Sequence, residues 1–142
     1  MILPILLYNN PYLRKKSIKI KKNINLDNLI NNMYDTMFYN LGVGLSAIQI
    51  GQNINLFIIG YHDEKKTIIN PKIIKKSKET VYFKEGCLSI PNVIRKIKRH
   101  KNILVTYYNK KWIKKKEKLT NILSIIFQHE YDHLKGKLII DY

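Results

Sequence analysis

The 142-residue sequence has one cysteine, few acidic residues and no long apolar run. A single cysteine excludes an intramolecular disulfide and is typical of a reducing compartment. No apolar stretch approaches the roughly 18 residues that a membrane-spanning helix needs. The apolar residues 1–7 are too short for a secretory signal and lack a charged start. We therefore expect a cytoplasmic protein with no membrane segment.

Acidic residues are few. The sequence has 10 Asp and Glu and 26 Lys and Arg, so its formal charge is +16. Only three of the basic residues are Arg. A scattered Lys excess is typical of solvated surface, and an A+T-rich genome would also encode many Ile, Lys and Asn residues. The alternative is contact with an acidic partner such as ribosomal RNA, for which residues 114–116 form the densest Lys run.

The chain has no internal repeat or Gly/Ser linker, and we expect one domain over residues 1–142. Apolar steps of three and four predict a helix over residues 26–41, and a second helix begins near Thr120 and ends at Gly136. A loop is expected over 41–52. β-Structure is expected over 54–60, 67–74, 81–83, 93–101, 103–108, from 112 onward as the hairpin partner of 103–108, and over 138–140. Asn70-Pro71 interrupts the strand over 67–74, which suits an edge strand or a bulge. The pattern predicts an α+β fold, in which mostly antiparallel sheets pack around the central C-terminal helix.

The strongest local pattern is His-Glu-x-x-His over residues 129–133, inside the predicted C-terminal helix. Residues four apart share a helix face, so His129 and His133 can hold one metal ion. Glu130 then lies beside the ion without binding it, where a carboxylate can take a proton from the attacking water and return it. The alternative is two helical histidines with ordinary hydrogen bonds, but a chance match to this pattern is uncommon.

Two histidines leave the site one protein ligand short, because a hydrolytic metal site usually has three. Nine residues follow His133, and Asp141 is the only acid among them. The third ligand is therefore expected upstream. Cys87 is the only thiol. A lone Cys is more often a small buried apolar residue, but beside an incomplete site the metal-binding interpretation is favoured.

Three segments together resemble the peptide deformylase family. Residues 42–49 (GVGLSAIQ) resemble its motif G-Φ-G-Φ-A-A-x-Q, residues 85–89 (EGCLS) match E-G-C-L-S, and residues 128–134 (QHEYDHL) match Q-H-E-x-D-H-L. Residues 2–14 also look like the family's opening strand and turn, so the resemblance covers nearly the whole chain. Ser46 stands where the family usually has Ala. The sequence stops at Tyr142, where many relatives continue into a C-terminal helix, and we expect no such extension.

The resemblance implies removal of the formyl group from the initiator methionine of new polypeptides, with release of formate. It implies Cys87, His129 and His133 as the metal ligands and Glu130 as the acid–base residue. The family is generally regarded as working best with Fe²⁺. A Cys-His-His donor set also suits Zn²⁺, and Ni²⁺ or Co²⁺ can substitute.

The resemblance further implies two donors to the oxygen of the attacked formyl group, the Gln49 side-chain amide and the Leu88 backbone N–H. Gly44 is expected to let the backbone approach the substrate peptide. The side chain of the substrate methionine is expected to contact Val43, Ile125 and Ile126, although the two isoleucines suit plain core equally well. Around the site, we expect Glu85 to pair with Arg95 or Arg99, and Asp132 to orient a neighbouring group.

Two other functions are also compatible with the sequence. A metallopeptidase that cuts internal bonds would usually take a carboxylate or third His in place of Cys87. A basic ribosome- or RNA-binding protein with a structural metal would need a fourth protein ligand, and no second Cys exists. We expect a monomer whose partners are N-formyl-Met nascent peptides, with ribosome contact through the basic surface as a further hypothesis.

Overall fold

The computed structural model describes residues 1–142 and contains two sheets and two α-helices. One antiparallel sheet has the order β1-β2-β3-β6-β7, and β4 pairs with β5 in a separate two-stranded sheet. The strands are β1 Gly44–Ser46, β2 Leu56–Tyr61, β3 Glu64–Lys76, β4 Thr80–Cys87, β5 Ile90–His100, β6 Asn102–Tyr108 and β7 Lys114–Thr120. The helices are α1 Asp27–Tyr39 and α2 Asn121–His133, with 3-10 turns η1 Pro11–Arg14, η2 Ala47–Ile50 and η3 Ile139–Asp141.

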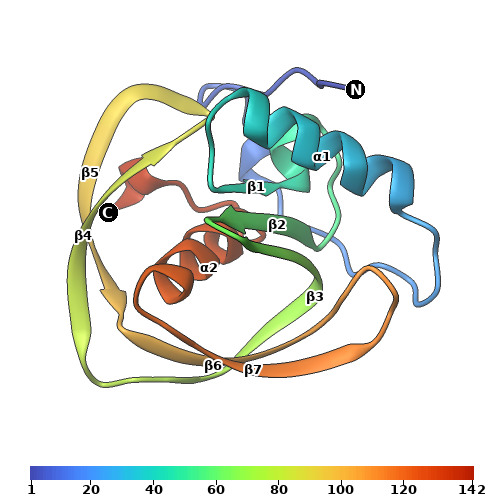
Figure 1. The fold of residues 1–142 in the computed structure, drawn as a ribbon. Coiled ribbons are helices and arrows are strands. Elements are labelled where there is room, and N and C mark those ends of the chain that lie inside the picture. Colours follow the sequence, from blue (N-terminus) through green and yellow to red (C-terminus); the bar gives the residue numbers. More distant parts are fainter.

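Helix α2 lies inside the ring of strands, and α1 covers the outer face of β1 and β2 (Figure 1). This arrangement explains the unbroken apolar run of β2, because that strand is buried on both faces. Phe57 and Ile59 belong to the core cluster around α2, where Phe57 packs edge-on against Phe127 at 5.0 Å between ring centres. Leu56 and Ile58 belong to the cluster beneath α1. The predicted α+β fold around a C-terminal helix is confirmed.

The interruption at Asn70-Pro71 is a bulge in a central strand, so the alternative of an edge strand is wrong. Strand β3 pairs with β2 on one side and with β6 on the other, and its register shifts between Ile69 and Lys72. Proline has no N–H for the ladder, and a bulge accommodates it. The Asn70 side chain bonds both the N–H and the carbonyl of Ile20, which ties the N-terminal segment to the sheet.

Short elements differ from the sequence-based expectations. Residues 41–52, expected as a loop, contain β1 and η2, and residues 138–140, expected as a strand, lie in and beside η3. Residues 1–7 form no strand. Segments of three or four residues contain too few side chains to display a period, which is why the pattern missed them. Neither α-helix combines the length and apolar character that a membrane crossing requires.

Candidate active site

Two histidines of α2 and the last residue of β4 meet at one point. His129 and His133 are one helical turn apart, with ring centres separated by 5.2 Å. The β4–β5 hairpin brings Cys87 against them, so its Sγ lies 3.5 Å from His133 Nε2. One donor atom from each of the three residues lies within 4.8 Å of the other two. The structure therefore brings together the three predicted metal ligands, of which one comes from β4 and two come from α2.

The chemistry of these donors fits a divalent transition metal. Glu85 Oε1 lies 2.9 Å from His129 Nδ1, which leaves His129 Nε2 free to face Cys87 and His133. His133 is buried, and burial together with the charges of His129 and Arg99 lowers its pKa well below the ordinary value. A neutral imidazole is the form that binds metal. A thiolate with two imidazoles is the donor set that Zn²⁺ and Fe²⁺ accept.

The protonation of His129 is set by its charged neighbours. Burial lowers the pKa of His129, but the charges of Glu130 and Cys87 and the hydrogen bonds to Cys87 and Glu85 outweigh it. The net result is a pKa well above the ordinary value. A surrounding that stabilises a positive charge at this ring also favours a cation bound to it, because metal and proton compete for the same nitrogen.

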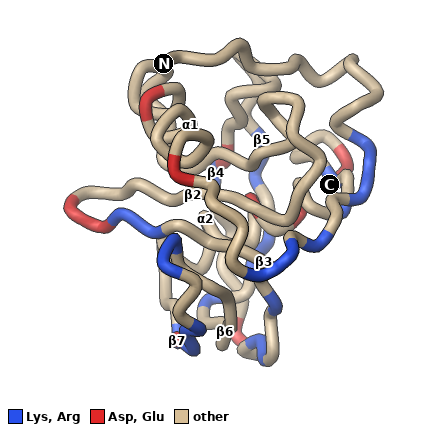
Figure 2. The backbone as a smooth tube through the Cα atoms, turned by 90° about the vertical axis from the view of Figure 1, so that its right-hand side faces the viewer, with Lys and Arg blue, Asp and Glu red and all other residues tan.

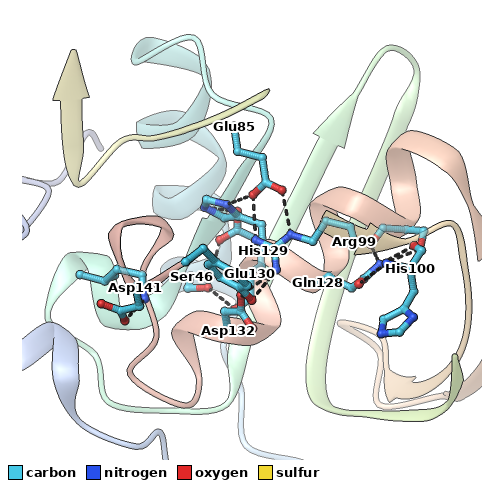
Figure 3. Close-up of polar contacts among 12 residues, drawn as sticks. Ser46, Glu85, Arg99, His100, Gln128, His129, Glu130, Asp132 and Asp141 are labelled. Atoms are coloured by element: carbon cyan, nitrogen blue, oxygen red, sulfur yellow. Dashed lines mark hydrogen bonds and ion pairs between the residues drawn. The ribbon is translucent and has the colours of Figure 1, made fainter. Parts of the chain in front are cut away.

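A buried ion pair supports His129 from behind (Figure 3). Arg99 donates to both Glu85 oxygens at 2.7 and 2.8 Å, and both side chains are almost fully buried. Arg99 also donates to Asp132 at 2.7 Å. The Tyr142 hydroxyl donates to the same Asp132 oxygen at 2.6 Å. The partner of Glu85 is therefore Arg99 rather than Arg95, and the neighbouring group that Asp132 contacts is Arg99.

Glu130 lies beside the three donor residues and is buried. Its Oε2 is 3.8 Å from His129 Nε2, and its Oε1 is 3.1 Å from the Ser46 hydroxyl. Burial raises the pKa of Glu130 to about 7, although His129 and the Ser46 hydrogen bond act in the opposite direction. A group with a pKa near neutrality can both accept and donate a proton under physiological conditions.

A cleft of about 420 Å³ opens above these groups. It is lined by Cys87, His129 and Glu130, while His133 lies beneath it. The other predicted site residues all line it as well: Val43, Gly44, Gln49, Leu88, Ile125 and Ile126. Both isoleucines are nevertheless largely buried, and Ile126 belongs to the core cluster around α2. The two isoleucines therefore belong both to the core and to the cleft wall, and their contact with the substrate methionine stays a prediction.

Gln49 and Leu88 flank Cys87 with N–H groups. The Gln49 side chain donates to Ser89 Oγ at 3.0 Å, and its amide nitrogen is also 3.7 Å from Cys87 Sγ. Its oxygen accepts from the Ser46 N–H at 2.9 Å, which fixes the amide orientation. Leu88 lies in the turn of the β4–β5 hairpin, where no backbone hydrogen bond engages its N–H. Both residues line the cleft, and their contact with a substrate oxygen stays a prediction.

Sequence reasoning missed two contacts of the site. Ser46 reaches Glu130 across 84 positions of the chain, and Tyr142 joins the Arg99–Asp132 pair from the last residue. Long-range contacts of this kind leave no local period. The one signal available was the departure from the family motif at Ser46, which placed a hydroxyl where an apolar methyl is usual.

The comparisons with known proteins agree on one family. Residues 2–142 match the family model described as polypeptide deformylase. A peptide deformylase of Karelsulcia muelleri is 55% identical, and the alignment covers 99% of this chain and 78% of that protein. The crystal structure of the Thermotoga maritima peptide deformylase superposes with a TM-score of 0.96 at 37% identity, over 99% of this chain and 97% of that one. A probable peptide deformylase from Synechococcus phage S-SSM7 gives a TM-score of 0.93 at 36% identity, over 99% of both chains. The chain belongs to the peptide deformylase family.

Proposed function

We propose that this protein hydrolyses the N-formyl group of the initiator methionine in newly made polypeptides, using residues 1–142 as a single catalytic domain. One observation carries the proposal. Donor atoms of Cys87, His129 and His133 lie within 4.8 Å of one another, two of these residues line the cleft, and the Glu130 carboxylate lies beside His129. The substrate meets the enzyme in the cytoplasm, and the protein acts as a monomer.

The three converging residues would hold one divalent cation, and we infer Fe²⁺, with Zn²⁺, Ni²⁺ or Co²⁺ able to take its place. Such a cation lowers the pKa of a water molecule and polarises a carbonyl. The buried Glu85–Arg99 pair keeps His129 Nε2 pointed at that position. Cys87, the last residue of β4, would supply the third ligand from the β4–β5 hairpin.

Glu130 performs the proton transfers in this proposal. Its carboxylate accepts the proton of the attacking water as oxygen bonds to the formyl carbon. It then delivers that proton to the methionine nitrogen as the carbon–nitrogen bond breaks, which yields formate and a free amine. In the metal-free protein, burial raises the pKa of Glu130 to about 7, so this carboxyl group can exist in both protonation states near neutral pH.

Gln49 and Leu88 stabilise the oxygen that gains negative charge when the formyl carbon becomes tetrahedral. The Gln49 amide nitrogen lies 3.7 Å from Cys87 Sγ, Leu88 follows Cys87 in the chain, and both residues line the cleft. Removing one donor of this type typically lowers the rate about 10²- to 10³-fold. Gly44 gives the substrate backbone room beside β1, and the methionine side chain contacts Val43, Ile125 and Ile126.

The proposal is tested by loading the protein with Fe²⁺ or Ni²⁺ under anaerobic conditions and measuring formate release from a short N-formyl-Met peptide. A Glu130→Gln variant is expected to bind the metal and lose turnover, since its amide cannot accept the water proton. No formate from fully metallated wild-type protein would contradict the proposed reaction. Full activity of Glu130→Gln would contradict only the acid–base assignment.

A basic hollow of about 610 Å³ lies between α1 and the β6–β7 hairpin. It favours a second binding partner besides the formylated peptide. Five lysines line it, Lys65, Lys66, Lys110, Lys111 and Lys115, against one acid, Glu117, which pairs with Lys66 at 3.3 Å. Lysines also occur in β3 and at the start of β7, where residues 114–116 are all Lys (Figure 2). Lysines contact phosphates as point charges, so we infer that this hollow binds the backbone of ribosomal RNA.

The RNA contact predicts a steep dependence on salt, because each phosphate neutralised by a lysine releases counterions. Binding of a ribosomal RNA fragment is expected to weaken as salt rises. A Lys110→Gln, Lys111→Gln double variant should reduce the slope by about two. An unchanged slope in this variant would place the contact elsewhere, and a flat response in the wild type would exclude it.

A further inference from the structure

The Glu130 carboxylate is held by a buried hydroxyl from the neighbouring strand β1. Ser46, at the end of β1, is fully buried. Its Oγ lies 3.1 Å from Glu130 Oε1 and also 3.1 Å from the Glu130 backbone oxygen (Figure 3). The contact connects β1 to the last turn of α2, which contains Glu130 and His133.

The hydroxyl has one proton for these two acceptors. The backbone oxygen of Glu130 is one of the last four carbonyls of α2, which have no partner within the helix. The carboxylate oxygen is the stronger acceptor, because hydrogen bonds to a charged group are about twice as strong as neutral ones. The carboxylate therefore takes the larger share of the Ser46 proton.

The two oxygens of Glu130 have different surroundings. Oε1 faces the Ser46 hydroxyl. Oε2 faces His129 Nε2 at 3.8 Å and the backbone of Gly44, where a Cβ would come within 2.5 Å of it. A carboxylate without an anchor rotates and exchanges its oxygens, which spreads the reactive oxygen over several positions. An anchor on Oε1 removes that freedom.

We propose that Ser46 is a positioning residue that holds Glu130 Oε1, so that Oε2 alone exchanges protons with the water and the leaving amine. The inference rests on the proposed deformylase function. The bond persists through the reaction, since the transferred proton resides on Oε2 and Ser46 continues to donate to Oε1. The family motif usually has Ala at this position, so the hydroxyl adjusts the rate and is no absolute requirement.

The test is steady-state kinetics of a metal-loaded Ser46→Ala variant on an N-formyl-Met peptide. We expect kcat to fall about three- to tenfold with KM unchanged, because the variant loses one net hydrogen bond in the chemical step that follows substrate binding. A disturbance of β1 itself would instead raise KM, because the same strand borders the substrate cleft. Metal content and melting temperature are measured for both proteins.

Ser124→Ala is the matched control. Ser124 is also a fully buried serine whose hydroxyl donates to a backbone carbonyl, that of His100 at 2.9 Å, and it has no contact with Glu130. Its kcat and KM should equal those of the wild type. The inference is overturned if Ser46→Ala retains kcat within twofold, if its loss appears in KM, or if Ser124→Ala loses as much. An inactive wild type would instead contradict the proposed function.

Discussion

Gly44 decides how much space the Glu130 carboxylate has. A Cβ at this position would lie 2.5 Å from Oε2 and 2.9 Å from the carboxyl carbon. An unanchored Glu side chain could move aside, but the Ser46 hydroxyl holds the other oxygen. The absence of a side chain at residue 44 therefore matters for the position of the acid–base group as well as for the approach of substrate.

Gly44→Ala is expected to fold and bind metal but to lose activity about 10- to 100-fold, because a displacement of about 1 Å in a reacting group has an effect of this size. The measurement is kcat beside metal stoichiometry. Gly51→Ala is the control, because Gly51 has φ 83° and open space around its Cβ position. That variant should lose about 1 kcal/mol of stability through backbone strain and keep its kcat. Full activity of Gly44→Ala would contradict the expectation that a Cβ at residue 44 displaces the Glu130 carboxylate.

At the scale of elements, the β4–β5 hairpin is connected to α2 by the Arg99 network. Arg99 of β5 bonds Glu85 of β4 and Asp132 of α2. Glu85 in turn bonds His129 of α2. The hairpin carries Cys87 and the helix carries the two histidines, so one buried guanidinium sets the relative position of all three donors.

Arg99→Met should destabilise the metal-free protein by about 3–5 kcal/mol, because it leaves the buried Glu85 carboxylate without its cation. Metal affinity should fall about 10- to 100-fold, because Glu85 without Arg99 no longer holds the His129 ring in place. Urea unfolding and metal titration measure the two effects. Arg95→Met is the control, since Arg95 lies opposite Glu85 in the hairpin but is exposed. A loss in Arg95→Met as large as in Arg99→Met would contradict the assigned pairing.

Glu85 also predicts how the metal-free protein responds to acid. Burial raises its pKa, but the hydrogen bonds from Arg99 and His129 outweigh burial and hold the pKa below its ordinary value of 4.5. A lowered folded pKa contributes stability that is present above 4.5 and lost as the pH falls through the folded value. The stability difference between wild type and Glu85→Gln should therefore shrink in acid, which urea unfolding at pH 7 and pH 3 measures. An equal stability difference at pH 7 and pH 3 would contradict the lowered pKa of Glu85.

The elements of the site were predictable to different extents. The spacing of His129 and His133 is a local helical pattern, and counting ligands then indicated Cys87. Strand alternation could not choose between Arg95 and Arg99, because residues four apart in a strand lie on the same face. The choice depends on where α2 crosses the hairpin, which is a tertiary feature. Ser46 was equally out of reach, since its contact with Glu130 spans 84 positions.

At the scale of the whole molecule, a bound cation would link the two sheets through α2. Cys87 belongs to the two-stranded sheet, while α2 packs on the five-stranded one. Such a link stabilises the folded state by about 2.7 kcal/mol when free metal is at 100 times its Kd. Removing the metal by chelation should lower Tm, and re-addition should restore it. Cys87→Ala should show no metal-dependent shift; a full shift in that variant would contradict Cys87 as a ligand.

The proposed reaction is defined by the bond that is broken. The most direct test is mass spectrometry of the products that the metal-loaded protein makes from a formylated peptide such as N-formyl-Met-Ala-Ser. We predict formate and intact Met-Ala-Ser in equal amounts. Cleavage of an internal peptide bond with the formyl group retained would contradict this account and indicate a metallopeptidase.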